Sequence, residues 1–192
     1  MLLLAPGLAA APLPVPPVAA IAPAVMPEYS VKAAYLVRFT RYIEWPAGTF
    51  ADASAPIVIG VLGRNPFGDL LVKSVAGVRS QGREVQVRVV ANLEETAGCH
   101  VIFIGRGQER DEALWLEALR QRPVVTVTDS PEGLARGAIL SLYVEEKAAG
   151  SRVVFGASLP AARRAGLQLS AAMLPSARQL IRGEEADPGE GV

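Results

Sequence analysis

The two side chains best suited to catalysis, Cys99 and His100, are neighbours in the sequence. The chain has one cysteine and one histidine among its 192 residues, so it can form neither an intramolecular disulfide nor a zinc cluster built on cysteines or a histidine pair. Both residues belong to an apolar run that predicts a strand, where adjacent side chains point to opposite faces. They cannot meet as nucleophile and base. We therefore expect a core thiol, a packed or hydrogen-bonded imidazole and no catalytic residue. In an oxidising compartment Cys99 has one other option, a disulfide with a second chain.

A second group of polar side chains follows the ends of predicted strands. Arg64 and Asn65 follow one apolar run, Arg106 follows another, and Asp129 follows a third. The carboxyl ends of parallel strands open onto one crevice, so these four side chains would share a rim. They suit a small zwitterion or the polar loop of a partner, because they include no activated nucleophile and no carboxylate pair. The alternative is structural, with Asp129 capping a turn and the arginines solvated.

Overall charge and glycine spacing exclude other classes of function. The chain has 19 basic and 19 acidic side chains, which removes the electrostatic attraction that nucleic-acid binding needs. The glycine-containing turn at residues 60–68 reads Gly-Val-Leu-Gly-Arg-Asn-Pro-Phe-Gly. It matches neither the dinucleotide fingerprint nor a phosphate-binding loop with its lysine. We expect no cofactor, no metal and no nucleic-acid partner.

The elements that must position these groups follow from changes in apolar periodicity. Helical spacing predicts helices over residues 28–44, 66–75 with Asn65 as the cap, 110–121, 160–165 and 170–182. Continuous apolar runs predict buried strands over residues 57–62, 99–104 and 124–128, and alternation predicts a half-exposed strand near a sheet edge over 83–90. Residues 138–144 and 152–155 are expected to pair antiparallel. This order predicts an α/β fold, a three-layer α/β/α arrangement with a largely parallel open sheet and an antiparallel edge pair.

The first predicted helix leads into the densest aromatic stretch of the chain. Its apolar stripe leaves Lys32, Arg38 and Arg41 offset from the core-facing side. Tyr-Ile-Glu-Trp-Pro follows at residues 42–46. Trp45 either anchors the helix end on the core or, if partly exposed, is a contact hot spot.

The two ends of the chain differ in composition from the part between them. Residues 1–27 contain no ionisable side chain and seven prolines, which excludes a membrane-spanning helix because proline breaks long helices. We interpret this stretch as a signal peptide or Pro/Ala-rich leader that exports the protein, although it lacks a basic first region. The alternative is a linker on a cytoplasmic protein. Residues 183–192 predict a disordered tail.

Five sequence segments, in this order, carry a resemblance to a known family. They are Val-Lys-Ala-Ala-Tyr-Leu at residues 31–36 with Ile-Glu-Trp-Pro at 43–46, the apolar run at 57–63 with Asn-Pro-Phe-Gly at 65–68, Cys-His-Val-Ile-Phe-Ile at 99–104, Val-Thr-Val-Thr-Asp at 125–129 and Gly-Leu-Gln-Leu-Ser at 166–170. Together they resemble the YfiR-like family of periplasmic repressors of membrane diguanylate cyclases, over about residues 29–182.

This resemblance implies a non-catalytic periplasmic domain over residues 28–182. Such a domain binds and inhibits an inner-membrane signalling protein, a diguanylate cyclase or a kinase, and lowers cyclic-di-GMP output. It implies no direct membrane insertion, and a homodimer is one oligomeric state that the family suggests. The expected contacts with the membrane partner are Arg41, Trp45, Leu167, Leu169 and Leu174, the leucines having the core as their alternative. The alternative function is a periplasmic small-molecule receptor that uses Arg64, Asn65, Arg106 and Asp129.

Two features depart from the family pattern. Gly-Ala-Ser at residues 156–158 stands where the family usually reads Glu-Ile-Asn, which removes a polar contact expected at that edge. Several members also carry paired cysteines that respond to redox state. With Cys99 alone, intramolecular redox sensing is not available to this chain.

Overall fold

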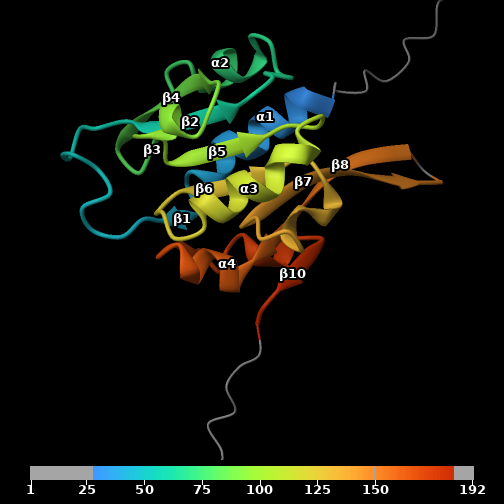
Figure 1. Cartoon of the computed structure of the whole chain (residues 1–192). Coiled ribbons are helices and arrows are strands. Elements are labelled where there is room, and N and C mark those ends of the chain that lie inside the picture. Colours follow the sequence, from blue (N-terminus) through green and yellow to red (C-terminus); the bar gives the residue numbers. More distant parts are fainter. Residues whose placement is uncertain (1–27, 149, 184–192) are drawn as a thin grey trace, which may run out of the picture.

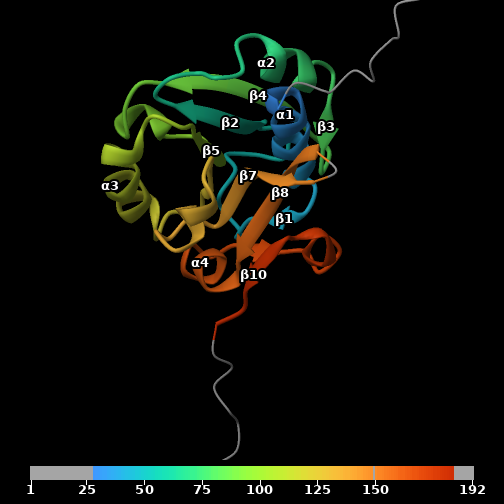
Figure 2. The ribbon, with the colours of Figure 1, turned by 90° about the vertical axis from the view of Figure 1, so that its right-hand side faces the viewer.

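The structure, a computed structural model, describes residues 28–148 and 150–183. The expected leader at residues 1–27, and the expected tail apart from Gly183, lie outside the described residues. Within them, eight strands form one curled sheet in the order β10-β8-β7-β6-β5-β2-β4-β3 (Figure 1, Figure 2). A separate two-stranded pair joins β1 (Ile43–Glu44) to β9 (Gln168–Leu169).

The remaining elements have the following bounds. The strands of the large sheet are β2 (Ile57–Leu62), β3 (Arg79–Ser80), β4 (Arg83–Val90), β5 (Val101–Ile104), β6 (Val125–Thr128), β7 (Leu140–Lys147), β8 (Gly150–Ser158) and β10 (Gln179–Ile181). The α-helices are α1 (Glu28–Phe39), α2 (Leu70–Val75), α3 (Glu109–Leu119) and α4 (Leu159–Arg164). Three short 3-10 helices are η1 (Glu94–Thr96), η2 (Pro131–Leu134) and η3 (Leu174–Ser176).

The pairing of the strands confirms the predicted fold class. β4, β2, β5, β6 and β7 run parallel to one another, and the short edge strand β3 pairs antiparallel with β4. β7 and β8 form the predicted antiparallel pair, and β10 adds a short parallel strand beyond it. β4 lies one strand from the other edge, as its half-exposed alternation predicted.

Helices cover both faces of the sheet, which explains why the central strands β2 and β5 are apolar throughout. Val101 and Phe103 of β5 belong to the core under α1 and α2, whereas Ile102 and Ile104 belong to a second core under α3. Figure 2 shows α3 on the opposite side of the sheet from α1. Because both faces are buried, a strand with alternating polarity would not fit at this position.

The first predicted helix is too long by about one turn. α1 ends at Phe39, and the chain turns back through hydrogen bonds from Arg41 N to Arg38 O and from Tyr42 N to Phe39 O. Ile43 then pairs with Leu169 as part of β1. Strand pairing with a distant segment, rather than Pro46, therefore ends the helix.

The predicted helix cap at Asn65 is also wrong. Asn65 instead closes a turn, accepting a hydrogen bond from Phe67 N at 2.9 Å and donating one to Gly68 O at 3.1 Å. Because the Asn65 side chain makes these two local hydrogen bonds, it does not cap a helix. α2 begins only at Leu70, after Asp69.

The last predicted helix, residues 170–182, is replaced by η3 and the strand β10. Proline at residue 175 removes a backbone donor, and the chain leaves the 3-10 turn in an extended conformation at Ala177. Arg178 N then donates to Phe155 O at 2.7 Å, and β10 pairs with β8. At Gly156, which pairs with Gln179, a Cβ would lie 2.7 Å from a methyl carbon of Leu134, so glycine makes room there for η2.

The β7-β8 hairpin extends beyond the body of the domain (Figure 1). Near its end Glu145 accepts hydrogen bonds from Arg152 at 3.1 and 3.2 Å and from Arg178, and it lies 3.2 Å from Lys147 Nζ. Burial raises the pKa of Glu145, but the bonds from Arg178, Lys147 and Arg152 outweigh burial and lower the pKa to about 2.

Among the described residues, none of the helices has the length and apolarity required to span a bilayer.

Candidate functional site

A buried network of charges occupies the rim formed by the carboxyl ends of β5 and β6. Asp129, directly after β6, has a fully buried side chain and pairs with Lys32 of α1, which is also fully buried. Arg106, just after β5, donates through Nε to Asp129 Oδ1 at 3.1 Å. Glu28 accepts from both Lys32 and Arg106. Ion pairs among two cations and two carboxylates therefore hold the first turn of α1 against the ends of β5 and β6.

Tyr29 completes this rim network. Its hydroxyl donates to Asp129 Oδ2 at 2.8 Å, and its ring stands edge-on to Phe67 at 5.4 Å. Burial, together with the hydrogen bond to Asp129, raises the pKa of Tyr29 above its usual value. The phenol therefore stays a donor to the carboxylate. Every charged member of the network faces another member, so the network can fix a helix but offers a ligand no unpaired charge.

The structure brings together two of the four predicted ligand-binding residues. Arg106 and Asp129 form an ion pair, as expected for neighbouring strand ends. Arg64 is exposed and Asn65 is occupied in its own turn. At this rim Asp129 is held by side chains of α1 and by Arg106, rather than acting as a simple turn cap. Arg106 is half-exposed rather than fully solvated.

Sequence reasoning missed Lys32, the residue at the centre of this network. Its offset from the apolar stripe placed it on the solvated side, yet its side chain is 0% exposed. The spacing of Glu28 and Lys32, four residues apart, was a usable signal for a pair on one helix face. Nothing local indicates the contact with Asp129, which lies 97 residues further along the chain.

The histidine predicted to be packed lies in an aromatic cluster. His100 Nδ1 accepts a hydrogen bond from Val58 N at 3.0 Å, and the imidazole stacks on Phe50 at 4.4 Å. Arg83 covers Phe50 at 3.9 Å, and Trp45 stands edge-on to His100 at 6.3 Å. Burial, and to a lesser extent the charge of Arg83, lowers the pKa of His100. The imidazole is thus a structural acceptor at neutral pH.

Cys99 is buried, in agreement with the expectation of a core thiol. Arg88 Nη2 lies 3.0 Å from its sulfur. A Cβ at Gly60 would lie 2.9 Å from the same sulfur, so the thiol is closely packed against β2.

The five predicted partner contacts differ widely in exposure. Arg41 is exposed and Trp45 is half-buried. Leu167 is 1% exposed and belongs to the core, which is the alternative given for the leucines. Leu169 and Leu174 are partly buried and pack against that core. Arg41 is therefore the most accessible of the five.

Two surface hollows adjoin the C-terminal half of α1 and the turn that follows it. One, of about 120 Å³, lies between α1, β8 and η3 and is lined by Tyr35, Arg38, Phe39, Tyr42, Phe155, Met173 and Ser176. The other, of about 410 Å³, lies between α1 and α2 and is lined by Ala34, Val37, Arg38, Arg41 and Ser74. Arg38 lines both hollows.

Within the described residues, no group of three or more His, Cys, Asp or Glu side chains is arranged to hold a metal ion.

Comparison with known proteins identifies relatives of this domain. A family model described as YfiR/HmsC-like matches residues 29–178. A solved structure of a conserved domain protein from Vibrio cholerae O1 biovar El Tor strain N16961 is similar, with a TM-score of 0.51 and 16% sequence identity. The similarity covers 79% of this chain and 60% of that chain, so this protein spans 60% of the Vibrio chain's length. At this identity the likeness shows the fold alone.

Proposed function

The chain belongs to the YfiR/HmsC-like family, and from that premise we propose that it is a non-catalytic periplasmic regulator. It binds the periplasmic part of an inner-membrane signalling protein, a diguanylate cyclase in the first instance, and lowers cyclic-di-GMP output. The observation that carries this proposal is the family match over residues 29–178, which spans nearly the whole described domain.

The geometry of the rim supports action through the outer surface. In open α/β sheets the crevice at the strand ends is the usual ligand site. Here the side chains of Lys32, Asp129, Glu28 and Arg106 pair with one another at that place. A ligand would have to break these ion pairs, of which the one between Lys32 and Asp129 is fully buried, to use them. Binding by surface side chains requires no such loss.

Inhibition by binding needs a partner with at least two states. The regulator shifts the partner toward its inactive state by as much as its affinities for the two states differ. A rigid domain suits this role, because it loses little conformational entropy on binding. The covered sheet and the fastened first turn of α1 supply that rigidity.

Deletion of the gene tests this function directly. We expect cellular cyclic-di-GMP to rise several-fold, and re-expression of the full chain to restore the low level. A variant that lacks residues 1–27 serves as the control, since without the leader it should stay in the cytoplasm and fail to restore repression. An unchanged cyclic-di-GMP level on deletion, or equal restoration by the leaderless variant, would show that the proposed function is wrong.

A periplasmic receptor for a small molecule is the second candidate function. The observation that favours it is the 120 Å³ hollow, in which Tyr35, Phe39, Tyr42 and Phe155 surround space beside the Arg38 guanidinium. Aromatic rings with one convergent cation suit a small aromatic anion. Native mass spectrometry of the protein purified from its own periplasm would detect such a molecule, and Arg38→Ala should release it.

A further inference from the structure

The groove between α1 and α2 combines apolar surface with two guanidiniums. Both helices pack on the core that lies on one face of the sheet, and Figure 2 shows them next to each other. Ala34 and Val37 contribute apolar surface, Ser74 comes from α2, and Arg38 and Arg41 supply the charge. The groove volume is about 410 Å³. It is thus a larger hollow than the aromatic one on the other side of Arg38.

The charge in this groove is not neutralised within the fold. Arg38 and Arg41 are both exposed, and neither forms an ion pair with an acidic residue of the described chain. Arg38 lies over the ring of Tyr42 at 5.7 Å, which leaves its donors available. Asp69, just before α2, is paired with Lys73 at 3.9 Å. The groove therefore favours an anionic occupant.

The shape of the groove favours a helix. Ala34 and Arg38 lie four residues apart on one side of α1, and Arg41 follows in the turn just beyond the end of the helix. On α2, Leu70 lies one turn before Ser74 on the same side and is 39% exposed. A cleft between two packed helices accepts the side-chain ridge of a third helix. An added strand would need an open sheet edge, which a groove between helices does not offer.

We propose that this groove binds an acidic amphipathic helix of the membrane signalling protein. The proposal rests on the proposed function, because it names the part of that partner which the regulator contacts. Two carboxylates one turn apart on the partner helix pair with Arg38 and Arg41, and guanidinium-carboxylate pairs of this kind are strong and directional. The apolar side of the partner helix lies on Ala34, Val37 and Leu70.

Site-specific crosslinking tests which segment occupies the groove. A photo-crosslinking amino acid is introduced at Ala34 in the full exported chain and, as a matched control, at the exposed Ala172. We expect the Ala34 variant to crosslink to a helical, acidic, periplasmic segment of an inner-membrane protein, identified by mass spectrometry of the crosslinked peptide. A crosslink to a segment without acidic residues, or the same crosslink from Ala172, would overturn the proposal.

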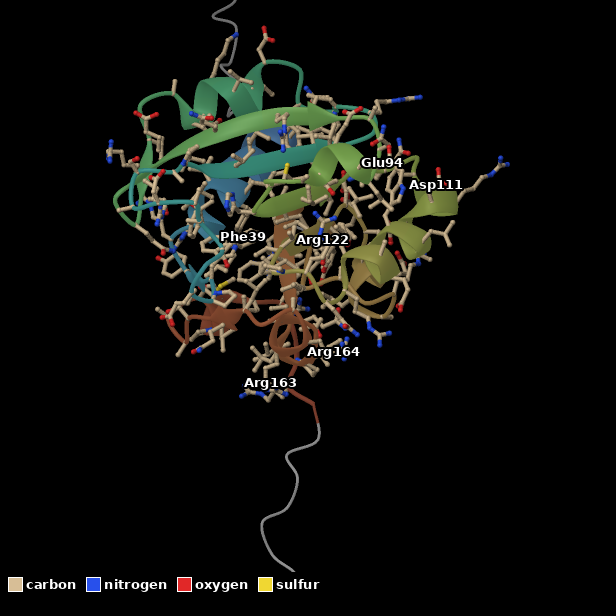
Figure 3. All side chains as sticks on the ribbon, turned by 60° about the vertical axis from the view of Figure 1, so that its left-hand side comes forward. Phe39, Glu94, Asp111, Arg122, Arg163 and Arg164 are labelled. Carbon is tan, nitrogen blue, oxygen red and sulfur yellow. The ribbon has the colours of Figure 1, made fainter. Side chains whose placement is uncertain are left out.

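Charge reversal distinguishes failure of the groove from failure of the function. Arg38→Glu with Arg41→Glu should weaken co-purification of the partner about tenfold or more and raise cyclic-di-GMP. Arg163→Glu with Arg164→Glu makes the same change of charge on α4, where Figure 3 shows both side chains at the lower end of the domain, below Phe39 of α1, and should have little effect. If the groove variant still represses, the groove assignment is wrong and the proposed function stands. If the unaltered chain does not repress, the function itself is wrong.

Two further measurements complete the test. A peptide with the sequence of the crosslinked segment, its acidic residues changed to lysine, should bind the Arg38→Glu, Arg41→Glu variant more tightly than the unaltered chain. Vesicles of phosphatidylglycerol and phosphatidylethanolamine test the other anionic surface of the envelope. Binding of vesicles that depends on Arg38 and Arg41, without binding of the unaltered acidic peptide, would overturn the proposal in favour of a lipid surface.

Discussion

The same helix, α1, carries basic side chains with opposite surroundings. Lys32 near its start is fully buried and pairs with Glu28 and Asp129. Arg38, near its end, and Arg41, just beyond it, are exposed and have no acidic partner in the described chain. Where the fold pairs a buried charge internally, removing one partner of the pair lowers the free energy of unfolding. Charges that the fold leaves unpaired contribute little to stability and can pair with another molecule.

The largest expected effect comes from Lys32→Met. Removing the ammonium leaves Asp129 buried beside only Arg106 and Tyr29, and breaking a buried ion pair in this way typically costs about 3–5 kcal/mol. The free energy of unfolding, measured by urea denaturation, should fall by that amount. Lys73→Met is the control, because its pair with Asp69 is exposed and is worth less than about 0.5 kcal/mol.

A double variant sharpens the same test. Asp129→Asn added to Lys32→Met should recover part of the loss, since it removes the unpaired buried carboxylate. A loss below about 1 kcal/mol for Lys32→Met alone would contradict the comparison, because it would show that the buried network contributes no more than a surface pair.

Tyr29→Phe should have an intermediate effect that depends on pH. The hydrogen bond to Asp129 contributes about 1 kcal/mol to the stability of the fold. Burial and Asp129 raise the pKa of Tyr29 above the unfolded value of 10.0, so the folded state keeps the proton when the unfolded state releases it. That stabilisation is present below about pH 10 and is lost as the pH rises above it. Urea midpoints from about pH 8.5 to about pH 10.5 should fall less steeply for the variant than for the unaltered chain.

His100 extends the comparison to a group that the fold buries without an acidic partner. Burial and Arg83 lower the pKa of His100 below 6.5, so protonation favours the unfolded state. The resulting stabilisation is present above about pH 6.5 and is lost as the pH falls below it. Unfolding measured at about pH 7.5 and at about pH 5.5 should show this loss, and His100→Gln should reduce it. Equal slopes for the two proteins would show that the stacked imidazole does not titrate with folding.

The smallest expected effect is that of Arg41→Glu on stability. The guanidinium is exposed and has no ion pair in the described chain, so the free energy of unfolding should change by less than about 0.5 kcal/mol. Urea denaturation under the conditions used for Lys32→Met makes the two values directly comparable. A loss above about 1 kcal/mol would break the comparison, because it would show that Arg41 stabilises the fold.

Features of the fold that depend on local pattern could be predicted from the sequence. β2 and β5 are apolar throughout because both of their faces are buried, and β4 alternates because it lies near an edge. Residues 170–182 were misassigned because a three-residue strand is shorter than one period of a helix. Its pairing is with β8, a strand that lies about twenty residues earlier in the chain, and local pattern does not indicate it.

For the candidate site too, one part could be predicted from the sequence and another part could not. Strand-end geometry predicted that Arg106 and Asp129 would lie together, and the structure joins them. Strand-end geometry could not predict that Lys32 joins this pair, because the burial of Lys32 depends on how α1 crosses the sheet. The groove beside Arg41 was also beyond prediction, because its other wall comes from α2 and the angle between two helices is not encoded in either one alone.

The place of β10 at the margin of the sheet has a consequence during synthesis. β8 emerges from the ribosome before residues 179–181, which cover its outer edge in the finished domain. Until then the nascent polypeptide presents bare strand backbone, the feature that drives edge-to-edge aggregation. An export chaperone that holds the chain unfolded until translation ends would prevent this premature association.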